Sequence, residues 1–315
     1  MADQNTTALM TSVARMYYLD RLGQTEIADI CGVSRSTVSR LLTGARDRGI
    51  VRISVDELDP RDRGLEQQLV SRFGLAYAIV IRDMGGPSTS VRRAVGYFAA
   101  PDLAEVVARR RMVGVAGGRT LAELVHHVET RLHGVGPTFV QILGAIGSSP
   151  SRIDASEQCR SLARRFNGAF RTLNTPAYAQ SHRARDLFLS HQEIQNVWAL
   201  FPAIDQALVG LGTLQESAFF ERGVLDEATA ARIRASGAVG EICGRFFDER
   251  GYECATEFSD RVISIGLDTL RDCPDVTAIL SGPARSHAIK AAIRGDIVKS
   301  IVIDQSGAGA LLALT

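Results

Sequence analysis

A glycine-rich turn near the middle of the chain has the residue types that hold a phosphate group. In "MVGVAGGRTLAELV", a β-strand pattern runs through Gly117 and Gly118 into a helical pattern. The backbone N–H groups of Gly118, Arg119 and Thr120 are expected to point at an anion, and the Arg119 guanidinium and the Thr120 hydroxyl add donors. The turn lacks the Gly-Lys-Ser/Thr of a Walker A loop and the full G-x-G-x-x-G pattern. A ligand-free tight turn remains the alternative.

Three further glycine turns follow the same logic. "QILGAIG" contains Gly144, "LVGLGTL" spans residues 208–214, and "LSGPARSHAI" places Arg285 in the first turn of a predicted helix, where its guanidinium could clamp a phosphate. Glu241, in "SGAVGEICGRFFDERG", could accept hydrogen bonds from sugar hydroxyls, although an acidic residue on a helix is more often solvated. Together these residues predict a site for a phosphorylated sugar or polyol.

Catalytic and metal chemistry have weaker support. Acid/base candidates exist, but they form no convincing pair: Glu241, Asp205, Asp268 and His287. The histidines show no metal-site spacing, and the five cysteines are scattered without a C-x-x-C pair. We therefore expect no catalytic residues, no cofactor and no metal.

The segment "GQTEIADICGVSRSTVSRLL" indicates two short helices joined by a tight turn. Ile27 and Ile30 are expected on one apolar face of the first helix, Gly32 permits the turn, and Ser34 is suited to cap the second helix. Val38 is expected to pack between the two helices. This pattern is typical of a helix-turn-helix.

The second helix presents arginine and hydroxyl side chains outside its apolar stripe. Such groups reach base edges or phosphates in a DNA groove. The predicted DNA-binding residues are Gln24, Thr25, Arg35, Ser36, Thr37, Ser39, Arg40 and Arg46. The alternating segment "IVRISV" at residues 50–55 predicts a strand, the wing of a winged helix. A buried helical hairpin with a solvated arginine face is the alternative.

The chain is predicted to contain two domains, residues 1–57 for DNA binding and residues 58–315 for effector binding and oligomerisation. The charged segment "DELDPRDRG" separates them as a hinge. Beyond it, apolar strands alternate with helices, which favours a parallel sheet covered by helices. The predicted strands are 76–81, 112–116, 138–143, 206–211, 262–265, 277–280 and 300–303.

Composition indicates a soluble cytoplasmic protein with free thiols. The 315 residues are 45% hydrophobic, which is sufficient for a substantial core, and carry a formal net charge of +1. No apolar run is long enough to span a membrane, and the N-terminus does not resemble a secretory signal. With so small a net charge, any surface that attracts DNA must be local.

Over nearly its full length the chain resembles the SorC family of bacterial sugar-responsive transcriptional regulators. The resemblance is carried by the helix-turn-helix segment, "VGVAGGRTLAEL", "ALVGLGTL", "GAVGEICGRFFDERG", "DRVISIGLDTL" and "AILSGPARSHAIKAAIRGDIVKSIVIDQSGAGALL". It implies a winged helix-turn-helix followed by a Rossmann-like effector domain similar to sugar-phosphate isomerases, deaminases and CoA-transferases. It also implies a phosphorylated sugar or polyol as inducer, and dimers that assemble into tetramers on operator DNA.

The chain departs from the family pattern at three positions. Gly117 stands where members commonly have tryptophan, Arg285 where they commonly have lysine, and Leu143 where asparagine is frequent. The leading hypothesis is a ligand-gated transcription factor that is not an enzyme. The alternatives are a sugar-phosphate isomerase or deaminase, and a structural DNA-associated protein without an effector.

Overall fold

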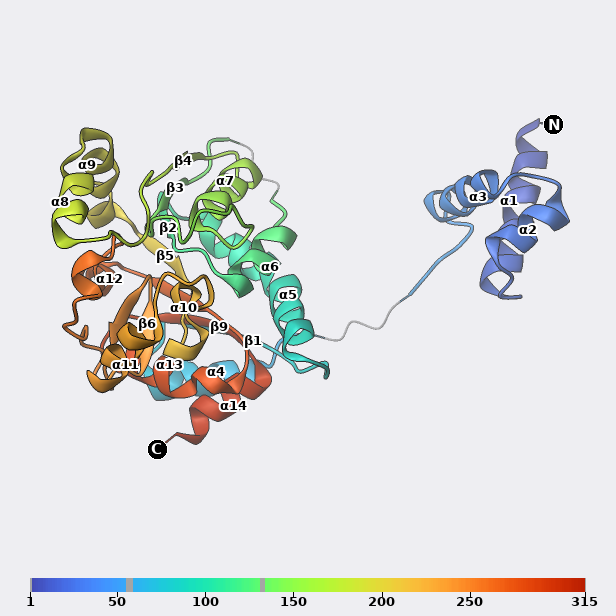
Figure 1. Ribbon diagram of the computed structural model, residues 1–315. Helices are drawn as coiled ribbons and strands as arrows, with labels where there is room; N and C mark the ends of the chain where they lie inside the picture. The colour runs from blue at the N-terminus through green and yellow to red at the C-terminus, as the bar shows by residue number, and fades with distance from the viewer. Residues whose placement is uncertain (1, 55–58, 131–133, 315) are drawn as a thin grey trace. The chain divides into compact units, whose positions relative to one another are not determined.

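The computed structural model describes residues 2–54, 59–130 and 134–314. The chain divides into two compact units, Met1–Leu58 and Asp59–Thr315 (Figure 1). We call them the small unit and the large unit.

The small unit is a bundle of three helices: α1 (Ala2–Tyr18), α2 (Gln24–Cys31) and α3 (Arg35–Asp47). Its core contains Val13 from α1, Ile27 from α2, and Val38 and Leu42 from α3, each at most 4% exposed. Ile30 is 60% exposed, so the predicted apolar face of α2 is narrower than expected.

The turn between α2 and α3 has the predicted capping residues. Gly32 ends α2 in the left-handed conformation, at φ +65°. The Ser34 hydroxyl caps α3 by accepting a hydrogen bond from the Thr37 N–H at 3.1 Å. Helix, turn and helix therefore occur where the sequence predicted them.

The predicted wing strand is wrong for the residues that can be examined. Residues 50–54 form no strand, and Val55 lies outside the described part of the chain. Ile50 and Val51 instead pack against the helical core, and the Val51 N–H donates to the Ala45 carbonyl at 3.0 Å. The β-branched pattern reflects this packing. The charged, proline-containing segment that follows offers no second alternating strand to pair with it.

The large unit is built on a seven-stranded sheet with the order β1-β9-β8-β5-β2-β3-β4, and all of its strand pairs are parallel. The strands are β1 (Tyr77–Ile81), β2 (Met112–Val115), β3 (Thr138–Gln141), β4 (Ala169–Arg171), β5 (Gln206–Val209), β8 (Val276–Ile279) and β9 (Ser300–Asp304). Six of the predicted strands are confirmed, with ends that shift by one or two residues.

The predicted strand at residues 262–265 is wrong. These residues follow a single 3-10 turn, Ser259–Arg261, and make only isolated bridges, Tyr178 to Val262 and Leu143 to Ser264. Their apolar side chains are buried in two different clusters, Val262 in one and Ile263 in another. Because neighbouring residues are buried in different clusters, the segment has an apolar sequence like that of a strand without pairing as one.

Helices cover both faces of the sheet, and alternate residues of each strand enter opposite cores. In β1, Ala78 and Val80 face one core, and Ile79 and Ile81 face the other. The Ile79 core is covered by α5 (Ser88–Ala108), α6 (Arg119–His127) and α7 (Ala155–Arg165). The other is covered by α4 (Arg63–Phe73), α9 (Gln192–Trp198), α12 (Leu267–Asp272), α13 (Ser286–Arg294) and α14 (Gln305–Ala313).

A separate subdomain is built around a two-stranded antiparallel hairpin of β6 (Gly240–Ile242) and β7 (Arg245–Phe247). It packs with α10 (Ala218–Glu221) and α11 (Glu227–Ala235) through a third cluster that contains Phe219, Phe246 and Phe258. Helix α8 (His182–Ser190) lies before α9. The remaining short elements are 3-10 turns at Phe201–Ala203, Leu214–Glu216 and Pro283–Arg285. No described helix combines the length and the hydropathy that a bilayer span requires.

Candidate functional site

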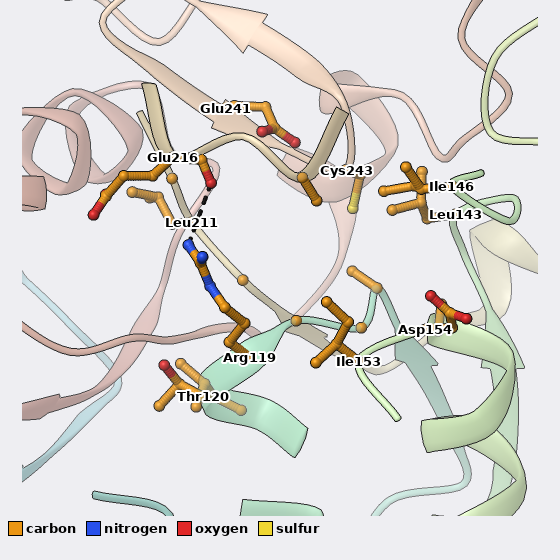
Figure 2. A pocket seen from close by; sticks show the side chains of 18 of the residues that line it. Arg119, Thr120, Leu143, Ile146, Ile153, Asp154, Leu211, Glu216, Glu241 and Cys243 are labelled. Carbon is orange, nitrogen blue, oxygen red and sulfur yellow. Dashed lines mark hydrogen bonds between the residues drawn. The ribbon is translucent and has the colours of Figure 1, made fainter. Parts of the chain in front are cut away.

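A cavity with about 980 Å³ of empty space, including the part open to solvent, lies where β2, β3, β5 and β8 end. Ligands of open α/β sheets bind at this edge. All seven residues predicted to bind an effector line this cavity: Gly117, Gly118, Arg119, Thr120, Gly144, Glu241 and Arg285. They come from the turn before α6, the segment after β3, the hairpin strand β6 and the turn before α13. Figure 2 shows Arg119, Thr120 and Glu241 among the lining side chains.

The Gly117–Gly118 turn brings the start of α6 into the cavity. A Cβ atom at Gly117 would lie 2.7 Å from the carbonyl oxygen of Ile153, so the segment before α7 occupies the space of any side chain there. A tryptophan side chain at position 117, which is common in the family, would therefore collide with this segment. The Gly118 N–H donates to the same Ile153 carbonyl at 2.9 Å, so the prediction that it points at an anion is wrong. Arg119 and Thr120 keep the unpaired N–H groups of a helix start.

Three arginines, Arg92, Arg119 and Arg285, line one part of the cavity. We call them the arginine cluster. Arg119 lies 2.6 Å from a carboxylate oxygen of Glu221 and donates to the Glu216 carbonyl at 3.4 Å (Figure 2). Arg285 lies 3.0 Å from the Glu216 carboxylate and donates to the Ser281 carbonyl. Arg92 is half-buried and makes no hydrogen bond or ion pair with any described residue.

The surroundings of Arg92 and Arg285 disfavour their positive charges. Burial lowers the pKa of Arg92, and the charge of Arg119 lowers it further, while the carboxylates of Glu123, Glu221 and Glu216 oppose the shift. Burial likewise lowers the pKa of Arg285; Glu216 opposes the shift, while Arg119 and Arg92 add to it. Cations held close together in a partly desolvated site attract an anion strongly, because the anion reduces their mutual repulsion and gives Arg92 a partner.

Glu241 lines a different part of the cavity. Its backbone pairs with Gly212 beyond β5, and its Oε1 accepts a hydrogen bond from the Gly244 N–H at 2.8 Å. Burial raises the pKa of Glu241, while hydrogen bonds from Ser217 and Gly244 oppose this shift. Glu241 lies on a strand, so the interpretation as a solvated residue on a helix is wrong.

The wall near Glu241 is partly apolar. Gly144 approaches the Pro176 carbonyl so closely that a Cβ atom would lie 2.5 Å from its oxygen. Leu143 and Ile146 also face the cavity (Figure 2). On the far side, Asp154 lies 2.9 Å from the guanidinium of Arg222.

The remaining acid/base candidates lie outside this cavity, among the residues that can be examined. Asp205 accepts hydrogen bonds from the N–H groups of Arg111 and Met112 at the start of β2, the opposite edge of the sheet. Asp268 is exposed and pairs with Arg271, and His287 is exposed on α13. Only Glu241 of the four lines the cavity.

The sequence reasoning missed Arg92, Glu216 and Arg222. Arg92 had a detectable signal, because it stands three and four residues before Val95 and Gly96, on the buried face of α5. A charged residue on such a face indicates a buried polar site. Glu216 and Arg222 lie in the short elements after β5, where no periodicity identifies their direction.

Most predicted DNA-binding residues are exposed on the small unit. Thr25, Arg35, Ser36, Ser39, Arg40 and Arg46 are exposed, and Gln24 and Thr37 are half-buried. Arg35 has no hydrogen bond or ion pair within the described chain. Among the described residues, Arg40 hydrogen-bonds to the Ser36 carbonyl and the Thr37 hydroxyl alone, both at 3.4 Å. Helix α3 therefore presents a basic, hydroxyl-bearing surface, and its arginines are not sealed inside.

Residues 61–313 match the profile of a family described as "Putative sugar-binding domain". The chain belongs to this family. Residues 19–52 match an IclR helix-turn-helix domain. The deoxyribonucleoside regulator of Bacillus subtilis is 28% identical over 98% of this chain and 99% of its own.

The sorbitol operon regulator of Klebsiella pneumoniae is 26% identical over 99% of this chain and all of its own. The crystal structure of full-length SorC from the same organism matches with a TM-score of 0.76 over 97% of this chain and 98% of its own. The protein is thus a SorC-family transcriptional regulator with a sugar-binding domain. Its α/β fold agrees with this family.

Proposed function

We propose that a phosphorylated sugar or polyol binds in the cavity and controls the affinity of α3 for operator DNA. One observation carries this proposal: Arg92, Arg119 and Arg285 converge beside the start of α6, where Arg92 makes no hydrogen bond or ion pair with any described residue. Helix starts and arginine forks are the usual ligands of phosphate oxygens in proteins.

The charges of the site favour the binding of an anion such as a phosphate group. Three positive charges, from the arginine cluster, face two negative charges, from Glu216 and Glu221. A phosphate dianion would pair with Arg92 and replace a glutamate at Arg119 or Arg285. Arg222 is a further arginine that lines the cavity, and its charge is already neutralised by Asp154 at 2.9 Å.

The sugar portion would lie against Glu241, Leu143 and Ile146. A carboxyl group with a raised pKa can accept a hydrogen bond from a hydroxyl when ionised and donate one when protonated. The two apolar side chains would contact the carbon skeleton. Arg285 supplies the anion contact that the family commonly assigns to lysine, with a planar fork in place of a point charge.

The small unit would bind DNA through the exposed face of α3. Arg35, Arg40 and Arg46 would contact bases or phosphates, and Ser36, Thr37 and Ser39 would add hydroxyl contacts, supported by Gln24 and Thr25 at the start of α2. We propose a dimer or tetramer on a palindromic operator, acting in the cytoplasm on the chromosome. An effector can change operator affinity only by binding unequally to two arrangements of the subunits.

We propose that the protein is not an enzyme. An isomerase needs an acid and a base placed over the substrate carbon. Of the candidates named from the sequence, only Glu241 lines the cavity, while Asp205 is bound to backbone at the other edge of the sheet. The relatives found by comparison are regulators by name.

A binding screen and a gel shift test the proposal together. Purified protein is heated with sorbitol 6-phosphate, deoxyribose 5-phosphate and fructose 6-phosphate, and with each parent compound lacking phosphate. We expect a higher Tm with one phosphate ester, no turnover, and a changed gel shift of the DNA upstream of its own operon. Turnover would favour an enzyme, and no stabilisation by any compound would favour a DNA-associated protein without an effector.

The DNA contacts have their own test. We expect the double variant Arg35→Ala, Arg40→Ala to bind the upstream DNA weakly, with a smaller dependence on salt, because two phosphate-reaching charges are gone. The control variant Arg109→Ala removes an exposed arginine of the large unit that lies outside the cavity and the entry segment. Undiminished DNA binding by the double variant would contradict the assignment of α3.

A further inference from the structure

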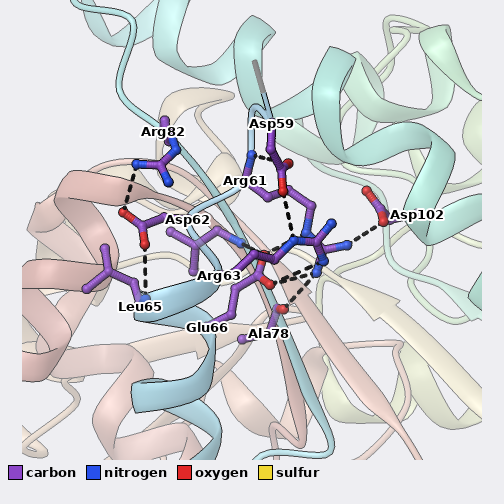
Figure 3. A network of polar contacts seen from close by, with 10 residues as sticks. Asp59, Arg61, Asp62, Arg63, Leu65, Glu66, Ala78, Arg82 and Asp102 are labelled. Carbon is purple, nitrogen blue, oxygen red and sulfur yellow. Dashed lines mark hydrogen bonds and ion pairs between the residues drawn. The ribbon is translucent and has the colours of Figure 1, made fainter. Parts of the chain in front are cut away.

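The chain enters the large unit as an added strand on the edge of the sheet. The Asp62 N–H donates to the Val80 carbonyl, and the Arg82 N–H donates to the Pro60 carbonyl, both at 2.8 Å. Arg61 and Ile81 form an antiparallel bridge. We call Asp59–Asp62 the entry segment (Figure 3). It is the first described part of the chain after the linker to the small unit.

A buried arginine fastens the entry segment on one side. Arg61, whose side chain is 12% exposed, binds both carboxylate oxygens of Glu66, at 2.7 and 2.8 Å. It also pairs with Asp102 of α5 (Figure 3). Glu66 in turn accepts the Val80 N–H at 3.0 Å. Such a bidentate, partly buried ion pair fixes Arg61 relative to β1 and α5.

The other side of the entry segment contacts the start of α14. Gln305, the first residue of α14, donates from its amide to the Asp62 carboxylate at 3.4 Å and accepts the Asp83 N–H at 3.1 Å. Gln305 thus joins the entry segment to the residues that follow β1. The bond between Gln305 and Asp62 is long for a hydrogen bond, so it is a weak connection.

Asp304, the residue before Gln305, contacts the turn that supplies Arg285 to the cavity. Its carboxylate accepts the Gly282 N–H with one oxygen and the Gly307 N–H with the other, the latter at 3.0 Å. The packing here is tight, because a Cβ atom at Gly307 would lie 3.1 Å from the Gly282 carbonyl oxygen. Asp304 is 1% exposed. These contacts hold the turn and the start of α14 together.

We propose that Asp304 and Gln305 form a relay that transmits effector binding from Arg285 to the entry segment, and hence to the linker of the DNA-binding unit. This inference rests on the proposed function of the cavity. The hydrogen-bonded connection runs from Arg285 through the Ser281 carbonyl and the Gly282 N–H to Asp304, and from Gln305 to Asp62. Gln305 is a positioning residue in this relay.

The physical step begins at the ion pair between Arg285 and Glu216. An anion that binds Arg285 competes with Glu216 and with the Ser281 carbonyl for the same guanidinium. The turn then loses an internal hydrogen bond and shifts, and Asp304 follows because its carboxylate is bound to Gly282. The displacement reaches Asp62 through the adjacent Gln305, where the long bond forms or breaks.

The variant Gln305→Met tests the relay, because methionine fills the same space and loses both amide hydrogen bonds. The matched control is Gln68→Met, an exposed glutamine of α4. The probe is inorganic phosphate against chloride at constant ionic strength, with hydrogen exchange as the readout. In the wild type we expect slowed exchange at residues 117–122 and 281–287, and changed exchange at residues 59–66.

In Gln305→Met we expect the cavity response to persist and the response at residues 59–66 to vanish, while Gln68→Met behaves as the wild type. The effect of phosphate on operator Kd, on the order of fivefold in the wild type, should fall below about twofold in Gln305→Met. Asp62→Asn removes the same bond from the other side while its remaining oxygen still caps α4. Because both substitutions remove the bond between Gln305 and Asp62, combining them should give no further loss of the response at residues 59–66.

The experiment distinguishes a failure of the proposed cavity function from a failure of the relay. No response at residues 117–122 and 281–287 in the wild type would refute the proposed function of the cavity and the relay with it. A cavity response without any response at residues 59–66 would refute the relay alone. A response at residues 59–66 that survives in both Gln305→Met and Asp62→Asn would also refute the relay.

Discussion

Replacing Arg92 by glutamine separates the charge of the cavity from its shape. Arg92 lines the cavity, and in the absence of a ligand it makes no hydrogen bond or ion pair within the described chain. An anion can therefore bind it without first breaking a protein contact. Arg119 and Arg285 differ, because each must release a glutamate. The loss on Arg92→Gln should thus report the full arginine–phosphate interaction.

A hydrogen bond to a charged group contributes about 1.5–3 kcal/mol, which corresponds to roughly 10- to 100-fold in Kd. We therefore expect Arg92→Gln to weaken binding of the phosphate ester by that factor. The ligand-free variant should be at least as stable as the wild type, because burial and the charge of Arg119 already lower the pKa of Arg92 and so disfavour its charged form.

Isothermal titration at two salt concentrations measures the first effect, and thermal unfolding without ligand measures the second. The control is Arg93→Gln, the adjacent exposed arginine of α5. A parent sugar without phosphate should bind wild type and Arg92→Gln alike. Equal affinity of both proteins for the phosphate ester, or an equal loss for ester and parent sugar, would refute the role given to Arg92.

Three further predictions concern local structure. Gly117→Ala should lower the free energy of unfolding by about 1–3 kcal/mol, because its Cβ would lie 2.7 Å from the Ile153 oxygen at a φ of +82°. Urea unfolding measures this loss. The control Gly309→Ala should cost little, because a Cβ atom there meets open space. Ser34→Ala removes the cap of α3 and should destabilise this helix by about 1 kcal/mol. Circular dichroism on heating should show a lower helix content, and DNA binding should be weaker. Unchanged melting would count against the cap. Burial raises the pKa of Glu241 above its ordinary 4.5, so ionisation of this carboxyl destabilises the folded state as pH rises. Glu241→Gln should therefore raise Tm near pH 7 and leave it unchanged below about pH 4. A difference in Tm that does not depend on pH would contradict this.

The helices and strands that bury a regular apolar pattern could be predicted from the sequence. The turn at Gly32, the cap at Ser34 and six sheet strands follow from local propensity and spacing. The wing and the strand at residues 262–265 could not be excluded locally, because a strand depends on a partner that is remote in sequence. Helix α1 was not predicted, since polar residues, several of them threonines, are interspersed among the apolar ones that pack, such as Val13.

The cavity, too, could be predicted from the sequence only in part. Glycine turns identify where strands end, so the residues next to them could be placed at one edge of the sheet. The partners of those residues could not be placed. Glu216 and Glu221 come from short elements whose direction only tertiary packing determines, and the fate of the Gly118 N–H depends on Ile153, which is distant in the sequence.

The entry segment has a consequence for the solubility of the large unit. The sheet ends at β1, and the Val80 carbonyl and the Arg82 N–H are paired there by Pro60 and Asp62. A large unit cut after Asp62 would leave these groups bare, as a template on which another molecule could add a strand. Fragments that begin before Pro60 should therefore stay dispersed at concentrations where shorter ones aggregate.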